Sequence, residues 1–455
     1  METEKHKSMP RGCHIIDLPR FTDSRGGLSF AESQGHIPFP IERVFWLYDL
    51  TSCRSRGGHS HGHCAQVVVA VHGAFDLVLD DGETRTTIHL DSPHRGVLIA
   101  PTVWDELKNF AKDTVVMVMA SHHFDAEDYI SDYEEYLGEL VELKPYDKSH
   151  VNEWDDFVDR AKNGTFLYKR GYMDYHADRF TDCSLMFYKR GELIGQLPAS
   201  WNKDCRTVTS HGGLTYGGLL LSESATTIET FNMMSCAASW FAHHLGAAEW
   251  IYKPIPYIYN SVPSEEDLYA LFRMEARLIG RHVSSAISCS HRIDMRTLRK
   301  RCIAKSRKSR LTYEECSEWD TFWSLLRTVL KSRHDTVPVH TLEEIVLLAS
   351  RFPDNIRLFV ARHEGNICAG AVVYETDTVA HTQYLAVSDE GTSHHALDGL
   401  IAYLAEDHYA NKPYFDLGTS MEPATSQLNE GLIFQKEGFG ARAVMYDTYL
   451  IKLKN

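Results

Sequence analysis

The sequence predicts a multidomain protein, with an all-β antiparallel barrel at the N-terminus followed by two tandem α+β units. Three observations lead to this prediction. The chain has 455 residues, about three times the ordinary length of one domain. Residues 11–125 are dense in short strand-like runs, and no long helical periodicity interrupts them. From about residue 152, strand-like runs alternate with long helical stretches.

The N-terminal strands are marked by apolar runs with turn residues between them. The runs span residues 65–71, 74–79, 86–90, 96–99 and 114–120. The segments between them contain His72-Gly73, Asp80-Asp81-Gly82 and Ser92-Pro93. Such residues favour tight turns, and short strands at this regular spacing favour an antiparallel barrel or sandwich. We expect the acidic, aromatic segment 125–151 to close this unit and link it to the next.

The second half contains stretches with helical periodicity, at residues 227–245, 264–279 and 341–351. We expect capping boxes at two of the helix starts, one formed by Ser264 with Asp267 and one by Thr341 with Glu344. Gly280 is placed to end the helix that begins at Ser264.

Two segments of the second half resemble each other. Residues 184–198 (SLMFYKRGELIGQLP) and 357–371 (RLFVARHEGNICAGA) both predict a strand, a glycine-containing turn and a second strand. A spacing of about 170 residues is too long for a solenoid and indicates a duplicated domain, although two hairpins can also resemble each other by chance. We therefore expect domains at residues 1–140, 141–290 and 291–455.

The formal net charge of −15 argues against a general nucleic-acid or anionic-membrane binder, because an acidic surface repels both. One local exception is the segment 292–310, which holds nine basic residues and one acid. A solvated helix face and a phosphate site are both open interpretations of it.

No targeting signal is evident in the sequence. The first residues contain no apolar run typical of a signal peptide, and no apolar run approaches the length of a membrane span. The ten cysteines form no C-x-x-C pair, which fits reduced thiols. We expect a cytoplasmic protein without a membrane partner.

A histidine cluster in the segment 57–66 (GGHSHGHCAQ) is the sharpest local feature. His59 and His61 are two residues apart and share one face of a strand. The pattern resembles the first motif of cupins, which hold a metal with H-x-H, a glutamate and a later histidine. Here Gln66 and Trp104 stand at the last two positions, and amide and indole are poor ligands. We therefore expect no metal, and either a proton-transferring pair or a purely structural one.

Six segments in unbroken order resemble dTDP-4-oxo-6-deoxyglucose 3,4-ketoisomerases. They are residues 37–48, 56–61, 80–82, 101–104, 120–121 and 128–130, within a resemblance that covers roughly residues 11–137. It implies a metal-free cupin that moves a carbonyl group from carbon 4 to carbon 3 of a dTDP-linked sugar. It also implies a homodimer formed through the cupin domain.

The same resemblance implies roles for individual residues. His59 and His61 match the family's histidines and are expected to act as base and proton shuttle. The residues expected to bind the dTDP-linked sugar are Arg25, Arg43, Arg56, Gln66 and Trp104. Guanidinium groups suit this role because they bind phosphate oxygens with two parallel hydrogen bonds.

The chain departs from that family at four positions. Phe45 and Trp46 stand where relatives usually have tyrosines, and Gly62 stands where a lysine is common. Asp105 stands where relatives carry histidine or arginine. These departures leave open an alternative in which the cupin binds a nucleotide sugar without converting it.

The second half resembles the Fem-type branch of the GNAT acyltransferases, which is built from two GNAT-like folds. The segments that carry this resemblance are 298–310, 334–341, 414–420 and 428–440. It implies transfer of an acyl group to an amine, from acyl-CoA in one branch and from aminoacyl-tRNA in the other. The expected catalytic residues are Asp416 and Glu430, which lie in the best-matching stretches.

Further residues of this half are expected to bind ligands. His334 and His340 are expected at the substrate. Gly391, Thr392 and Ser393 follow a predicted strand and precede a helical stretch, where a GNAT fold holds the CoA pyrophosphate, and Lys436 is a candidate phosphate contact.

Together the two resemblances predict a bifunctional nucleotide-sugar enzyme. The cupin would isomerise dTDP-4-oxo-6-deoxyglucose, and the second half would N-acylate a dTDP-3-amino-3,6-dideoxyhexose for O-antigen or S-layer sugar synthesis. Acetyl-CoA is the expected co-substrate, and other acyl-CoA donors stay open. A tRNA-dependent aminoacyltransferase is the alternative for the second half.

Overall fold

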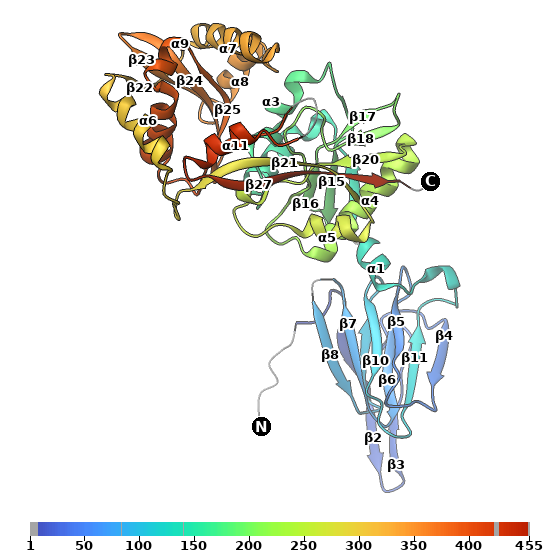
Figure 1. Cartoon of the computed structure of the whole chain (residues 1–455). Coiled ribbons are helices and arrows are strands. Elements are labelled where there is room, and N and C mark those ends of the chain that lie inside the picture. The colour runs from blue at the N-terminus through green and yellow to red at the C-terminus, as the bar shows by residue number, and fades with distance from the viewer. Residues whose placement is uncertain (1–7, 83, 140, 423–426, 454–455) are drawn as a thin grey trace. The chain divides into compact units, whose positions relative to one another are not determined.

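The computed structural model describes residues 8–82, 84–139, 141–422 and 427–453. The chain divides into two compact units, Met1–Val141 and Glu142–Asn455, coloured blue to cyan and cyan to red in Figure 1. The boundary expected near residue 290 lies inside the second unit and stays a prediction. No helix of the described residues is both long and apolar enough to cross a membrane.

Two five-stranded antiparallel sheets build the first unit, as its all-β pattern predicts. The first has the order β1 (His14–Asp17), β9 (Arg95–Ile99), β6 (Gln66–His72), β11 (Val115–Ala120), β4 (Arg43–Leu47). The second has the order β12 (Tyr129–Ile130), β5 (Arg56–His61), β10 (Trp104–Lys108), β7 (Phe75–Asp80), β8 (Arg85–Leu90). All five strands expected from apolar runs are present within one or two residues of their expected bounds.

The core of the first unit lies between the two sheets. Along each strand alternate residues point inward. Val68 and Val118 come from the first sheet, Leu77 and Leu107 come from the second, and all four are buried in one cluster. Burial of such a side chain stabilises the fold by roughly 1.5–3 kcal/mol.

Smaller elements complete the first unit. The hairpin of β2 (Arg20–Asp23) and β3 (Gly26–Ser29) projects beyond the sheets, and α1 (Tyr133–Glu139) lies at the opposite end of the unit (Figure 1). A short 3-10 helix, η1 (Ala126–Asp128), precedes β12. It brings Asp128 to the end of β5, because Tyr129 pairs with His61.

The second unit contains a four-stranded and an eleven-stranded sheet. The smaller sheet has the order β13 (Val141–Pro145), β15 (Leu185–Lys189), β16 (Glu192–Leu197), β19 (Leu220–Leu221). The larger has the order β14 (Thr181–Asp182), β17 (Ser200–Asn202), β18 (Thr207–Thr209), β20 (Glu249–Tyr252), β27 (Arg442–Lys452), β21 (Arg277–Ser288), β26 (Tyr414–Thr419), β25 (Val379–Val387), β24 (Asn366–Glu375), β23 (Ile356–His363), β22 (Thr312–Cys316). Strands from both sides of residue 290 therefore share one sheet.

Helices flank these sheets. The longer α-helices are α2 (Val151–Arg160), α4 (Thr227–Leu245), α5 (Glu266–Arg273), α6 (Thr297–Lys308), α7 (Trp319–His334), α8 (Leu342–Arg351), α10 (Ala396–Tyr403) and α11 (Glu430–Glu437). The shorter helical segments are η2 (Lys148–His150), η3 (Phe166–Tyr168), α3 (Arg170–Met173), η4 (Asp174–His176), η5 (Tyr257–Tyr259), α9 (Asp389–Ser393) and the π-helix η6 (Leu404–His408). Of the helices expected from periodicity, α4 has the expected bounds and α8 begins one residue late.

One predicted capping box forms and the other does not. Thr341 accepts from the backbone of Glu344, whose side chain accepts from the backbone of Thr341. The box expected at Ser264 is wrong, because Glu265 is the N-cap of α5 and makes no side-chain cap bond. Gly280 does not end that helix either. It lies inside β21, because pairing with β27 extends the strand back to Arg277.

The two similar segments both fold into hairpins, β15–β16 and β23–β24. Their turns use the same pair of left-handed residues, Arg190-Gly191 with φ of 52° and 82° and Glu364-Gly365 with φ of 48° and 87°. Two central residues with positive φ suit the twist of a two-residue hairpin turn. The shared geometry supports a duplicated unit.

The basic segment 292–310 includes α6. Its buried side chains are Cys302, Ile303 and Ser306, and most of its basic side chains are exposed. Arg299 pairs with Asp398 of α10 and Arg296 pairs with Glu437 of α11. These ion pairs suit a solvated helix face, while Arg292, Lys300 and Arg307 line one hollow, so both interpretations stay open.

Candidate active sites

His59 and His61 share one face of β5, as their spacing predicts. Their ring centroids are 5.0 Å apart. The strand reaches this geometry through Gly57 and Gly58, which have φ of 70° and 72°. A Cβ at Gly57 would lie 2.5 Å from Oδ2 of Asp105, so only glycine allows β5 to approach β10 this closely.

His61 is held at both ring nitrogens and is 4% exposed. The amide nitrogen of Gln66, on β6, donates to Nε2 over 2.8 Å. Nδ1 lies 3.2 Å from Oδ2 of Asp128 and donates to that carboxylate. Burial lowers the pKa of His61, the neighbouring His59 lowers it further, and Asp128 opposes both effects. The site therefore holds a neutral imidazole of fixed tautomer and orientation at neutral pH.

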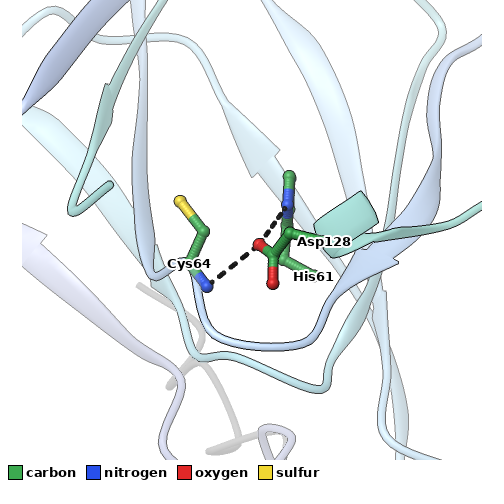
Figure 2. A group of neighbouring side chains, drawn as sticks. All are labelled: His61, Cys64 and Asp128. Atoms are coloured by element: carbon green, nitrogen blue, oxygen red, sulfur yellow. Dashed lines mark hydrogen bonds and ion pairs between the residues drawn. The ribbon is translucent and has the colours of Figure 1, made fainter. Parts of the chain in front are cut away.

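Asp128 binds the loop after β5 as well as His61. Its carboxylate accepts from the backbone nitrogens of His63 (2.8 Å) and Cys64 (3.3 Å). Burial raises its pKa, but hydrogen bonds from His63, His61 and Cys64 outweigh this and lower it overall. Figure 2 shows the carboxylate between the His61 ring and the Cys64 nitrogen, with the sulfur turned away.

Metal-ligating atoms of His61, Cys64 and Asp128 lie within 4.8 Å of one another. The hydrogen bonds to Asp128 and the amide on His61 Nε2 already use most of the lone pairs a metal would need. The donor set therefore fits a hydrogen-bonded network better than a metal centre.

His59 faces a carboxyl group instead. Its Nε2 lies 3.8 Å from Oδ1 of Asp105, and Asp105 is directly opposite His59 on the neighbouring strand β10. Burial lowers the pKa of His59 and raises the pKa of Asp105 to about 7. Asp105 can therefore exchange a proton near neutral pH, where the His59 imidazole is uncharged and can accept one.

The structure does not bring Trp104 to the histidines. Strand alternation turns its ring to the other face of β10, where it packs on Tyr133 and Tyr136 at centroid distances of 5.1 and 5.5 Å. Asp105, the next residue, takes the inward position.

The three arginines expected at the substrate lie in different environments. Arg43 stacks on Phe45 and Phe124, its Nε is buried without a hydrogen-bond partner, and its charge acts on His61. Arg56 is exposed at the start of β5, and Arg25 is exposed on the β2–β3 hairpin, paired with Asp23 over 2.6 Å. Only Arg43 therefore joins the histidine pair within one chain.

Tyr129 was not assigned a role from the sequence. Its ring centroid lies 4.9 Å from that of His59 and 4.2 Å from that of His61. The pairing of β12 with β5 places it there. That pairing joins residues far apart in the chain, so local sequence patterns do not reveal it.

In the second unit, Asp416 of β26 lies at the centre of a buried network. It is fully buried and accepts from Ser284 Oγ (2.7 Å), Gly418 N (3.0 Å) and Tyr446 OH (3.1 Å). His381 Nδ1 of β25 lies 2.9 Å from its Oδ2. Burial raises the pKa of Asp416, but His381 and the other donors outweigh it and lower the pKa overall. Asp416 is therefore an ionised carboxylate behind an imidazole.

His381 lines a small cavity of about 10 Å³. The lining residues are Phe166, Leu167, Thr215, Tyr216, Tyr259, Tyr374, Thr376, His381 and Gln383. Three of them, Phe166, Tyr259 and Thr376, also line a second hollow of about 130 Å³, which Lys162 and Lys169 line as well. Tyr259 OH lies 2.9 Å from Tyr446 OH, which links the cavity wall to Asp416.

The strand geometry around His381 opens a gap in the sheet. β25 and β26 are parallel and pair only over three residues, Val379–His381 with Tyr414–Asp416. A register shift against β24 leaves Gln383 as a bulge two residues later. The pairing of β25 with β26 ends at His381. On the edge of β25 that faces β26, the backbone N–H groups beyond His381 can therefore bind a ligand.

Two residues expected to be catalytic or substrate-binding lie elsewhere. Glu430 is exposed at the first residue of α11, and no described interaction joins it to Asp416. His340 is buried and bonded to Tyr384 OH (2.7 Å), and burial lowers its pKa to about 4. The side chain of His334 lies outside the described residues. The sequence did not single out His381, because its pairing with Asp416 depends on the strand order.

The residues expected to bind CoA have internal partners. The hydroxyls of Thr392 and Ser393 donate to helix carbonyls, and a Cβ at Gly391 would lie 2.3 Å from the Cys368 carbonyl oxygen. Lys436 is buried and donates to the carbonyls of Gly418 and Thr419, and burial lowers its pKa to about 8. The structure gives these residues packing roles, and their contact with a cofactor stays a prediction.

Comparisons with known proteins match the two units to different families. Residues 11–140 match the family described as WxcM-like, C-terminal, and residues 290–424 match the acetyltransferase (GNAT) domain. The TDP-4-oxo-6-deoxy-alpha-D-glucose-3,4-oxoisomerase of Aneurinibacillus thermoaerophilus is 39% identical over 129 residues, which are 28% of this chain and 93% of that protein.

Solved structures resemble both units. The sugar 3,4-ketoisomerase QdtA of Thermoanaerobacterium thermosaccharolyticum, crystallised with TDP, is 32% identical, with a TM-score of 0.28 over 29% of this chain and 96% of that chain. The crystal structure of FemX is 12% identical, with a TM-score of 0.52 over 69% of this chain and 97% of that chain, which shows a shared fold.

The predicted fold class and both predicted resemblances are thereby confirmed: the all-β cupin-like unit precedes a FemX-like α+β unit. The chain is an enzyme with isomerase and transferase parts; through its first unit it belongs to the WxcM-like family, which includes a sugar 3,4-oxoisomerase, and its second unit carries a GNAT acetyltransferase domain.

Proposed function

We propose that the first unit isomerises dTDP-4-oxo-6-deoxyglucose to the 3-keto sugar. The observation that carries this proposal is the identity of 39% to an oxoisomerase over nearly that protein's whole length. The geometry supports it, since His59, His61, Gln66, Arg43 and Tyr129 meet at one end of the sheets.

The proposed mechanism moves protons without a metal. An imidazole base removes the acidic proton from carbon 3, next to the ketone, and gives an enediol. A proton returned to carbon 4 completes the isomerisation. His59 is the better base, because Nε2 of His61 already accepts a hydrogen bond from Gln66. Nε2 of His59 lies 3.8 Å from Asp105, which is too far for a hydrogen bond, so its lone pair is available to the substrate. His61 would shuttle protons, and the half-buried Arg43, whose Nε has no hydrogen-bond partner, would bind the substrate's diphosphate.

The test is proton exchange at carbon 3 of dTDP-4-oxo-6-deoxyglucose in deuterated water, followed by NMR. We expect exchange and formation of the 3-keto sugar, and a loss of about 100-fold or more in both for His59→Gln. A control variant is His89→Gln, which changes an exposed histidine on β8 paired with Asp76. Binding of the dTDP-sugar without exchange would show instead a binding module.

We further propose that the second unit transfers an acyl group from acyl-CoA, by default acetyl, to a dTDP-3-amino-3,6-dideoxyhexose. The observation that carries it is the His381–Asp416 pair at the gap between two parallel strands, facing a cavity. His381 would accept the proton of the attacking amine, and Asp416 would stabilise the resulting imidazolium. The unpaired N–H groups of β25 would bind the developing oxyanion.

The two reactions belong to one route. The 3-keto product of the first must be aminated by a separate enzyme before the second can acylate it. The final acylamido sugar would serve O-antigen or S-layer synthesis, and the intermediates would be cytoplasmic.

Release of CoA from acetyl-CoA in the presence of the dTDP-3-amino sugar tests the transferase. We expect His381→Gln to lower kcat by about 100-fold or more. His282→Gln is the matched control, because His282 is exposed on β21 of the same sheet. No release from acetyl-CoA, together with transfer from aminoacyl-tRNA, would favour the tRNA-dependent alternative.

We also propose a homodimer formed through the first unit. The outward face of the edge strand β4 and the residue after it expose Val44, Trp46 and Tyr48, and Trp46 is 62% exposed. A second copy is the occupant that suits an apolar edge of this size. Light scattering should give a dimer mass for the wild type and a monomer mass for Trp46→Glu.

A further inference from the structure

Asp105 is a buried carboxyl group that faces His59 from the opposite strand. The two residues are a directly paired position of β10 and β5, and Oδ1 lies 3.8 Å from Nε2. Asp105 is 3% exposed, while the His59 side chain is 22% exposed. At 3.8 Å the two groups are neighbours rather than hydrogen-bond partners. A substrate that lies against His59 would therefore also lie next to the Asp105 carboxyl.

The surroundings of Asp105 hold few charges. β7 places Leu79 opposite it, and Leu107 follows on the same face of β10. The titratable groups nearby are His59 on β5 and the buried thiol of Cys13, whose pKa is raised by burial and by Asp105 and Asp81. No lysine or arginine in the described part of the chain forms an ion pair with Asp105. Burial without a partner charge keeps this carboxyl protonated up to about pH 7.

The proposed isomerisation needs a group of this chemistry. When the carbon 3 proton leaves, the oxygen on carbon 4 must gain a proton. When carbon 4 is protonated, the oxygen on carbon 3 must lose one. A carboxyl group can donate a proton from one oxygen and accept one at the other. An imidazole that carries the carbon proton cannot also transfer the hydroxyl proton.

We propose that Asp105 is a catalytic residue of the isomerase site, which carries the hydroxyl proton between the two substrate oxygens while a histidine carries the carbon proton. This inference rests on the proposed ketoisomerase function. His59 takes the proton from carbon 3 as Asp105 protonates the oxygen on carbon 4. The enediol then takes the proton from the imidazolium at carbon 4, and the Asp105 carboxylate accepts the proton from the oxygen on carbon 3. Both residues return to their starting states, so protons and charges balance.

The experiment compares wild type, Asp105→Asn and Asp105→Glu in the full chain. Carbon 3 exchange and isomerisation are measured across pH 5 to 9. We expect both rates of the wild type to fall above about pH 7, where Asp105 ionises. Asp105→Asn should lower both rates by about 100-fold and abolish that fall, and Asp105→Glu should restore part of the rate. The control is Glu106→Gln, because Glu106 faces the other side of β10 and lies near Lys108.

The outcomes separate the two proposals. Exchange in the wild type with rates of Asp105→Asn within threefold of it, and an unchanged pH profile, would overturn the role of Asp105 but keep the isomerase. No exchange in the wild type would remove the isomerase proposal itself. If Asp105→Asn fails to fold, the pH profile of Asp105→Glu is the test. A shift in the pH at which its isomerisation rate falls supports the catalytic role of Asp105, and a fall at the same pH as in the wild type contradicts that role.

Discussion

At the scale of single residues, Asp105 and Asp416 show how differently a protein can treat a buried carboxyl group. Asp416 accepts hydrogen bonds from four groups, and its pKa is lowered despite complete burial. Asp105 has no comparable donors, and burial raises its pKa to about 7. Asp416 is therefore suited to steady a positive charge, and Asp105 is suited to carry a proton.

This contrast predicts a pH dependence of stability for the first unit. In the unfolded chain Asp105 loses its proton near pH 4, whereas in the folded chain it keeps it up to about pH 7. The folded state therefore binds more protons in this window, and the free energy of unfolding falls as pH rises through it, by at most about 4 kcal/mol. Urea unfolding of wild type and Asp105→Asn at pH 4 and pH 8 checks this. Between pH 4 and pH 8 the free energy of unfolding of the wild type should fall relative to that of the variant. The same change in both proteins would contradict the prediction.

At the scale of elements, the two glycines of β5 offer a matched pair of substitutions. Both have positive φ, but a Cβ at Gly58 meets nothing within 4 Å, whereas one at Gly57 collides with Asp105. We expect Gly58→Ala to cost about 1 kcal/mol of unfolding free energy, from backbone strain alone. Gly57→Ala should cost about 1–3 kcal/mol more, because β5 and β10 must separate. Equal losses in urea unfolding would show that this contact can relax.

The elements also show which features the sequence could predict. Apolar runs and turn residues located five strands of the first unit, β6 to β9 and β11, and strand parity put His59 and His61 on one face. The register of the strands and the pairing of strands far apart in the chain could not be predicted from local sequence patterns. The choice between Trp104 and Asp105 depended on which residue of β10 points inward, and β21 extended into an expected helix because β27 pairs with it.

The transferase site was harder to predict for the same reason. Asp416 was identified from its stretch of sequence, but its partner His381 lies 35 positions earlier on another strand. Only the parallel pairing of β25 with β26 brings them together.

At the scale of the whole molecule, the two units have separate cores. The buried clusters of the first unit contain residues up to Met119, and those of the second begin at Trp154. We therefore expect fragments 1–141 and 142–455 to fold separately and to keep the isomerase and transferase activities respectively. Circular dichroism and the two assays check this. Loss of one activity on separation, with its fragment folded, would show that the units depend on each other.

The order of strands in the large sheet also constrains when each unit can form during synthesis. β27 spans Arg442–Lys452, yet it lies between β20 and β21, which end at Tyr252 and Ser288, much earlier in the chain. The eleven-stranded sheet cannot close until residue 452 has left the ribosome. The first unit has all of its strands by Ile130. The isomerase can therefore be complete while most of the transferase is still being translated.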